Sequence, residues 1–116
     1  MVDESIVRVV QNYLHKCREQ GLEVRFGVIF GSQAKETTHK WSDIDLVVVS
    51  PAFDGVRRDE EVNLLWHATA YTDSRIEPIA CGEWQWEHDD VSTIIEVARR
   101  EGVRVDVPEE ASVAKT

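Results

Sequence analysis

The chain has 116 residues, of which 42% are hydrophobic and 30% are charged, and this composition excludes a disordered chain and an integral membrane protein. Its length suits a single domain with one small core. Thirteen Lys and Arg residues against 22 Asp and Glu residues give a formal net charge of −9, which disfavours tight binding to duplex nucleic acid. The same charge is compatible with a metal-complexed nucleotide and with a basic protein partner.

The first half of the chain predicts two helices and two strands. Residues 4–20 carry apolar side chains at helical spacing and are followed by a glycine, which indicates an amphipathic helix. Residues 24–30 are dense in apolar side chains and predict a central strand that ends at Gly31. A short helix is expected at 32–36, and a second strand at 44–50.

The next segments predict a loop at 51–58, a helix at 59–72 and a short strand at 75–80. One side of the predicted helix carries Val62, Leu65, Trp66 and Thr69. Pro78 cannot donate a backbone hydrogen bond, so we expect the strand that contains it to lie at the edge of its sheet.

The last segments predict a helix from Asp89 or Asp90 to Arg100 and a final short strand at 103–107. The residues at helical spacing in that helix are Val91, Ile94, Ile95 and Ala98. We therefore expect one domain over residues 1–107, followed by a mobile tail at 108–116. The alternation of helices and strands indicates an α/β (α+β) fold with a small mixed sheet and flanking helices.

Two carboxylates one residue apart, Asp43 and Asp45, open the second strand. Side chains alternate along a strand, so these two project from the same face about 6 to 7 Å apart. Oxygen ligands placed in this way suit a hard cation such as Mg²⁺. Gly31 and Ser32 close the preceding strand, at the point where backbone N–H groups can bind phosphate.

The order and spacing of these residues carry more weight than each motif alone. Gly31-Ser32-Gln33-Ala34-Lys35, followed by Trp41-Ser42-Asp43-Ile44-Asp45-Leu46, resembles the signature of the DNA polymerase β-like nucleotidyltransferase superfamily, specifically of the minimal nucleotidyltransferases. The resemblance is tight over about residues 31–49 and loose over 1–107.

The resemblance implies transfer of a nucleoside monophosphate, AMP from ATP or the corresponding group from another nucleoside triphosphate, to an acceptor hydroxyl with release of pyrophosphate. Gly31, Ser32 and Lys35 would bind the triphosphate. One or two Mg²⁺ ions would be held by Asp43, Asp45 and a third carboxylate from a later strand.

The best candidate for the third carboxylate is Glu77, because it interrupts an apolar strand. Asp73, in a polar turn, is the weaker candidate. Two features depart from the family pattern: Glu77 replaces the usual aspartate, and Lys35-Glu36 stands where Arg-Gly is common.

Minimal members of this superfamily are often paired with a HEPN-type helical partner in toxin and antitoxin modules, which implies a protein as acceptor. A second hypothesis is a catalytically inactive module of the same fold that neutralises its partner by contact alone. A third, less favoured reading is a sugar-nucleotide transferase, since those enzymes also use Asp-x-Asp. The sequence leaves open whether the chain forms oligomers.

The remaining chemistry-bearing residues indicate structural roles. Cys17 and Cys81 lack CxxC spacing, and the chain has no signal peptide or long apolar run, so we expect reduced cysteines and a cytoplasmic protein. The histidines lack the spacing of metal ligands. Trp84 and Trp86 are the tryptophans most expected to be exposed.

Overall fold

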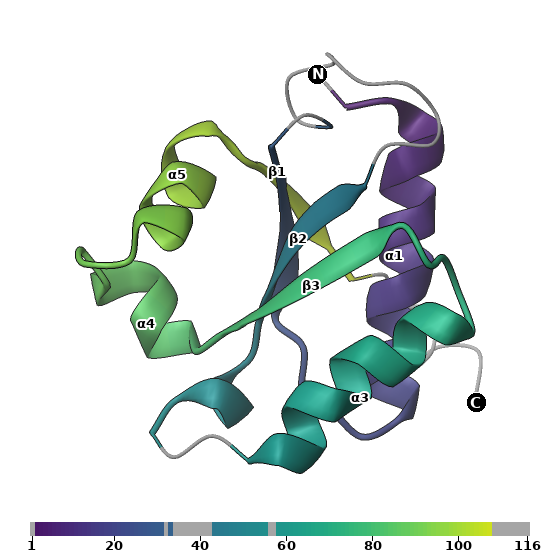
Figure 1. The fold of residues 1–116 in the computed structure, drawn as a ribbon, viewed down its shortest axis with the longest axis horizontal. Helices are drawn as coiled ribbons and strands as arrows, with labels where there is room; N and C mark the ends of the chain where they lie inside the picture. Colours follow the sequence, from purple (N-terminus) through teal and green to yellow (C-terminus); the bar gives the residue numbers. More distant parts are fainter. Residues whose placement is uncertain (1, 32, 34–42, 56–57, 108–116) are drawn as a thin grey trace.

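The computed structural model describes residues 2–31, 33, 43–55 and 58–107. They form a four-stranded mixed sheet with helices on both faces, as Figure 1 shows. The strands are β1 (Phe26–Phe30), β2 (Ile44–Val49), β3 (Ile76–Cys81) and β4 (Val103–Asp106). The expected mixed α/β architecture is therefore confirmed.

The order of the strands across the sheet is β3-β2-β1-β4. β1 runs antiparallel to both β2 and β4, whereas β2 and β3 are parallel. The parallel pair needs a crossover connection, and α3 (Asp59–Ala70) supplies it. β3 lies at the edge of the sheet, as Pro78 predicted.

One face of the sheet is covered by α1 (Glu4–Glu19) and α3. Apolar side chains of these helices pack on alternate strand residues to form the larger core, whose members include Val10, Tyr13, Leu14, Ile29, Ile44, Leu46, Val48, Leu65, Ile76 and Val105. The buried hydroxyl of Tyr13 donates a hydrogen bond of 2.7 Å to the carbonyl oxygen of Leu65, which joins the two helices.

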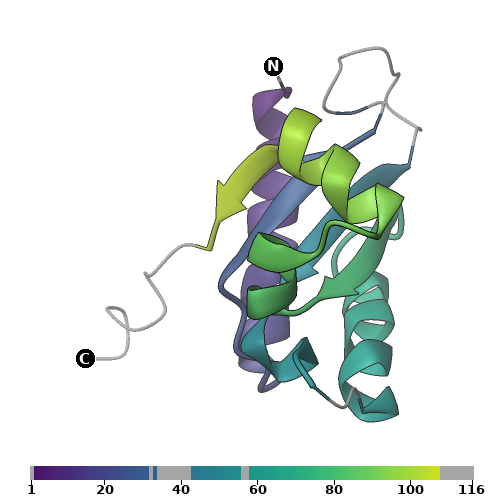
Figure 2. The same ribbon diagram turned by 90° about the vertical axis from the view of Figure 1, so that its left-hand side faces the viewer.

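The opposite face is covered by α4 (Glu83–His88) and α5 (Thr93–Glu101), the two helices nearest the viewer in Figure 2. The second, smaller core lies beneath them and consists of Phe26, Val28, Val47, Val49, Cys81, Ile95 and Ala98. Trp86 packs edge-on against Phe26, with ring centroids 5.8 Å apart. The sheet face beneath these two helices is therefore apolar.

Three local predictions differ from the structure. The predicted loop at 51–58 contains a short 3-10 helix, Pro51–Phe53, which Ser50 caps by accepting a hydrogen bond from the Ala52 amide. α4 was not predicted, because six residues are too few to establish a helical period. Trp66, expected on the apolar side of α3, is half exposed, and Leu65 and Ala68 are the buried residues of that helix.

The last helix begins later than its apolar pattern suggested. Ser92 caps α5 by accepting a hydrogen bond from the Ile95 amide, so the helix starts at Thr93. Ile95 and Ala98 then face the sheet, while Val91 and Ile94 are exposed. Two of the four apolar side chains at helical spacing thus lie on the surface.

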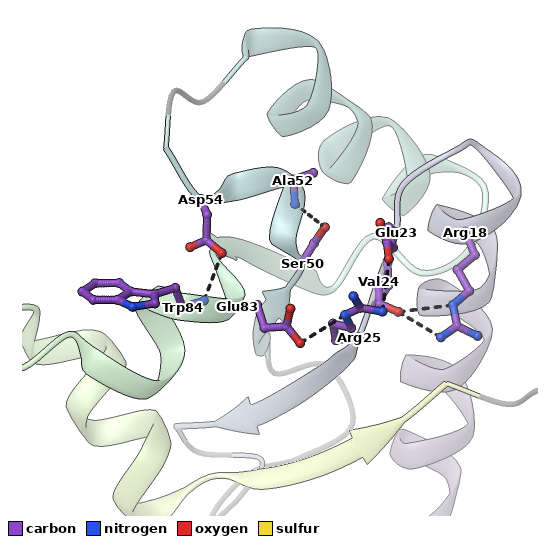
Figure 3. Close-up of polar contacts among 9 residues, drawn as sticks. All are labelled: Arg18, Glu23, Val24, Arg25, Ser50, Ala52, Asp54, Glu83 and Trp84. Atoms are coloured by element: carbon purple, nitrogen blue, oxygen red, sulfur yellow. Dashed lines mark hydrogen bonds and ion pairs between the residues drawn. The ribbon is translucent and has the colours of Figure 1, made fainter.

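Figure 3 shows the contacts that join α4 to the segment before β1 and to the segment after β2. Arg25, just before β1, forms an ion pair of 3.1 Å with Glu83. Asp54 accepts hydrogen bonds from the backbone amides of Trp84 and Gln85, at 3.0 and 3.3 Å. These contacts fix the position of α4 even though it is short.

Both cysteines are buried and neither forms a disulfide. Burial raises the pKa of the Cys17 thiol to about 11, so this thiol stays protonated at neutral pH. Among the helices that the structure describes, none has both the length and the apolar character needed to cross a membrane.

Candidate active site

Strand pairing brings Asp45 and Glu77 together at one end of the sheet. The two residues are Cα partners in the parallel β2–β3 pair. Neighbouring strands lie about 4.8 Å apart, so partner side chains on one face are in reach of each other. Asp43 lies two residues before Asp45 and joins the same group at the start of β2.

These carboxylates share the sheet face that α4 and α5 cover further along. Asp45 has the same orientation as Val47 and Val49, which belong to the smaller core. Glu77 likewise has the orientation of Cys81. The face therefore changes from apolar to acidic along the strands, with Asp45 half-buried and Asp43 and Glu77 exposed.

The carboxylates influence one another's pKa. A hydrogen bond with Asp43, and then the charge of Asp43, raise the pKa of Glu77 above its ordinary value, with smaller effects of burial and of Asp45. Burial raises the pKa of Asp45, and the charge of Asp43 raises it further. Like charges crowded in this way are stabilised by a cation placed between them.

Gly31 lies beside Asp45, directly after the neighbouring strand β1. It follows Phe30, whose Cα partner across the β1–β2 pair is Asp45. The φ angle of Gly31 is +75°, a backbone conformation that favours glycine. A Cβ atom at this position would lie 2.4 Å from Oδ2 of Asp45, so the carboxylate occupies space that any other residue would fill. The sequence suggested Gly31 as a phosphate contact and gave no sign of this approach to Asp45.

The weaker candidate for the third carboxylate, Asp73, is engaged in a separate ion pair. Its carboxylate accepts hydrogen bonds from the backbone amide of Arg75 at 2.9 Å, from Nε at 3.0 Å and from Nη2 at 2.7 Å. These hydrogen bonds lower the pKa of Asp73 below its ordinary value. The structure thus favours Glu77 over Asp73 as the partner of Asp43 and Asp45.

The donor set fits a hard divalent cation, because every contributing side chain is a carboxylate. In the part of the chain that the structure describes, no three acidic, histidine or cysteine side chains are already arranged as a metal cage. The other two predicted substrate contacts, Ser32 and Lys35, lie outside the described residues.

Comparison with protein families identifies the class to which this fold and site belong. The family profile described as "Nucleotidyltransferase domain" matches residues 10–109. The chain therefore belongs to the nucleotidyltransferase domain family, which confirms the resemblance carried by Gly31 and the two aspartates. No curated protein matches the chain significantly in sequence.

Solved structures share the fold at low sequence identity. A candidate nucleotidyltransferase from Sulfolobus solfataricus is 14% identical, with a TM-score of 0.60 over 84% of this chain and 77% of that one. A toxin–antitoxin complex with AMP-PNP contains a chain that is 18% identical, with a TM-score of 0.56 over 90% of this chain and 78% of that one.

A third similar structure is a tri-AMPylated HEPN toxin from Shewanella oneidensis in complex with its MNT antitoxin. The matching chain is 14% identical, with a TM-score of 0.52 over 93% of this chain and 78% of that one. Together these likenesses support the nucleotidyltransferase fold of the chain.

Proposed function

We propose that this protein is a Mg²⁺-dependent nucleotidyltransferase that transfers AMP from ATP to a hydroxyl group on a partner protein. The observation that carries the proposal is the meeting of Asp43, Asp45 and Glu77 on one sheet face, with Gly31 against Asp45. Phosphate transfer needs little more from a protein than positioning and charge neutralisation, which such a site can supply. We assign the whole activity to one domain over residues 1–107.

In this reaction the acceptor oxygen forms a bond to the α-phosphorus of ATP, and the bond between the α-phosphorus and the bridging oxygen breaks. Pyrophosphate leaves, and the proton of the acceptor hydroxyl passes to solvent water. Asp43, Asp45 and Glu77 would hold one or two Mg²⁺ ions, which supply charge neutralisation and lower the pKa of the acceptor hydroxyl. Ser32 and Lys35 would contact the triphosphate, as the sequence predicts.

The protein acceptor is supported by the structural relatives. One relative is a toxin–antitoxin complex with AMP-PNP, and another contains a HEPN toxin carrying AMP groups beside its MNT antitoxin. We therefore propose a HEPN-like helical protein as the partner of this chain, acting in the cytoplasm. An acidic chain with a net charge of −9 suits such a partner better than it suits a nucleic acid acceptor.

Incubation of the protein with labelled ATP, Mg²⁺ and the product of the adjacent gene tests the proposal. We expect the partner to gain the mass of one or more AMP groups, and EDTA to abolish the gain. The variant carrying Asp43→Ala with Asp45→Ala should transfer at least about 100-fold more slowly. Glu60→Gln, on the opposite face of the sheet, is the matched control and should transfer at the wild-type rate.

Transfer that continues unchanged in the double variant would show that the assigned site is wrong. Absence of transfer by the wild type, together with tight complex formation, would favour the second candidate function, a contact-only binding module. That candidate is supported by the lack of a ready metal cage among the described residues and by glutamate in place of the usual aspartate at Glu77.

A further inference from the structure

The structure exposes an apolar surface that neither core uses. Three exposed apolar side chains on α4, on α5 and on their connection contribute to it, Trp84, Val91 and Ile94, and the exposed His88 lies beside Trp84. The exposed fractions are 64% for Trp84, 88% for Val91 and 48% for Ile94. Together with the exposed acidic residues Glu87, Asp90 and Glu96 of the same segment, they form what we call the α4–α5 surface.

The Trp84 ring and the backbone at Trp84 and Val91 are held in place. The Trp84 ring stacks on His88, with ring centroids 4.2 Å apart and an interplanar angle of 14°. The Trp84 amide donates to Asp54, as Figure 3 shows. The Val91 amide donates to Asp89 Oδ1 at 2.8 Å. Side chains fixed before binding lose little conformational entropy in a complex, which is typical of anchor residues.

The two helices are also joined to each other. The Arg99 guanidinium donates a 2.6 Å hydrogen bond to the Trp86 carbonyl oxygen and a second hydrogen bond to the carbonyl oxygen of Asp89. Figures 1 and 2 show α4 and α5 side by side on one face of the sheet. α4 and α5 are therefore joined to each other, and they lie on the sheet face that carries the candidate active site.

Charge decides what can cover this surface. Residues 76–98 contain six acidic residues and neither Lys nor Arg. The two cations in the last turn of α5 are both engaged, Arg99 with the carbonyl oxygens of Trp86 and Asp89 and Arg100 in an ion pair of 3.4 Å with Glu101. Glu83 is paired with Arg25, but Glu87, Asp90 and Glu96 remain exposed around the apolar residues. A second copy of the chain would bring like charges together, and a nucleic acid would be repelled. A protein segment with Lys or Arg beside an apolar stripe is complementary to the surface.

We propose that the α4–α5 surface docks a basic, amphipathic segment of the protein that receives the nucleotide, and that this docking brings the acceptor hydroxyl to the carboxylates on the same sheet face. The proposal rests on the proposed function for the identity of the partner. It adds where the partner binds and which chemistry the partner presents.

Binding of the purified adjacent-gene product, measured by titration calorimetry, tests the proposal separately from transfer. Trp84→Ala and Val91→Ser should each weaken binding about 10-fold or more, because central aromatic and apolar anchors dominate such interfaces. Glu87→Lys should weaken binding as well, and binding of the wild type should weaken with added salt. Transfer by these variants should recover at saturating partner concentrations.

The opposite face of the sheet offers matched controls on α3. Trp66→Ala removes a tryptophan of similar exposure, and Glu60→Lys reverses an exposed glutamate. Both should bind within about twofold of the wild type if the interface lies on α4 and α5. Thermal unfolding of all five variants checks that each one is folded.

The outcomes separate the two proposals. Binding that Trp84→Ala leaves intact, with transfer present, overturns the docking surface and leaves the function standing. Binding that Trp84→Ala weakens, in the absence of any transfer by the wild type, supports the docking surface and overturns the proposed function. Absence of wild-type binding overturns both. A wild-type homodimer that Trp84→Ala dissociates would show that a second copy covers the surface and would overturn the assignment to a basic partner.

Discussion

Gly31 and Asp45 are matched to each other, because the Asp45 carboxylate lies where a side chain on Gly31 would begin. Gly31→Ala should therefore displace Asp45 and strain a backbone whose φ angle is +75°. We expect a loss of about 1 to 3 kcal/mol in the free energy of unfolding and at least about 10-fold slower transfer. Urea unfolding and the AMP transfer assay measure the two effects.

Gly21→Ala is the control for this prediction. Gly21 also has a positive φ angle, of 104°, but nothing lies within 4 Å of a Cβ placed there. This variant should lose a similar amount of stability and keep its transfer rate. Equal transfer rates for Gly31→Ala and Gly21→Ala would contradict the role given to the contact with Asp45.

Substitution of Glu77 should slow transfer, whereas substitution of Asp73 should lower stability. Glu77→Gln takes away a carboxylate that touches Asp43, so transfer should slow by about 100-fold or more, while the melting temperature stays the same or rises as repulsion is relieved. Asp73→Asn breaks the ion pair with Arg75 and should lower stability instead. Melting temperatures and transfer rates of both variants, measured side by side, decide which carboxylate belongs to the site.

A reversed pattern, with slow transfer in Asp73→Asn and normal transfer in Glu77→Gln, would give the third position to Asp73. Glu77→Asp refines the comparison, since it restores the residue type usual in the superfamily. We expect this variant to retain transfer, because a carboxylate remains in register with Asp45.

The buried hydroxyl of Tyr13 links α1 to α3 through the Leu65 carbonyl oxygen. Tyr13→Phe removes the donor and should reduce the free energy of unfolding by about 1 kcal/mol, the usual net value of one hydrogen bond. Tyr71→Phe is the matched control, because Tyr71 is well exposed at the end of α3. Urea unfolding of the two variants should therefore separate them, and equal stabilities would show that the Tyr13 hydrogen bond contributes nothing.

Asp89 makes the connection between α4 and α5 sensitive to acid. The side chain of Gln85 and the backbone amides of Ser92 and Val91 donate to its carboxylate and lower its pKa to about 2. Because folding favours the ionised form, this contribution to stability is complete above the ordinary pKa of about 4 and is lost as the pH falls through about 2.

Asp89→Asn should remove this contribution, so that the unfolding free energy depends less on pH between about 4 and 2 than it does in the wild type. Urea unfolding at a series of pH values measures the difference. Asp90→Asn, one residue further along the chain, is the control and should retain the wild-type dependence. Parallel curves for Asp89→Asn and the wild type would contradict the prediction.

The sequence predicted those parts of the fold that depend on local patterns. The apolar runs before Gly31 and after Asp43 are strands, and the helical spacing at residues 4–20 is a helix. Pro78 correctly indicated an edge strand, because a missing backbone donor constrains a strand wherever it lies. Asp43, Asp45 and Glu77 could also be selected as candidates from the sequence.

Local sequence patterns do not show which strands pair in the sheet or in which register. That Glu77 pairs with Asp45 depends on the parallel register of β2 and β3, which the crossover through α3 sets. The exposure of Val91 and Ile94 could not be predicted either, because the apolar spacing does not show at which residue the helix begins. The start of α5 at Thr93 places Ile95 and Ala98 inward instead.

Because β3 is an edge strand, the proposed catalytic role of Glu77 can be lost without loss of the fold. Glu77 is exposed on a strand with a single neighbour, whereas Asp45 belongs to a central strand between two others. If Glu77 has the proposed role, a substitution at this exposed position should silence transfer while both cores and the α4–α5 surface remain as they are. Under the proposed function, a gene with such a substitution would keep partner binding and lose transfer, so we expect active and silent descendants of this protein to differ at Glu77.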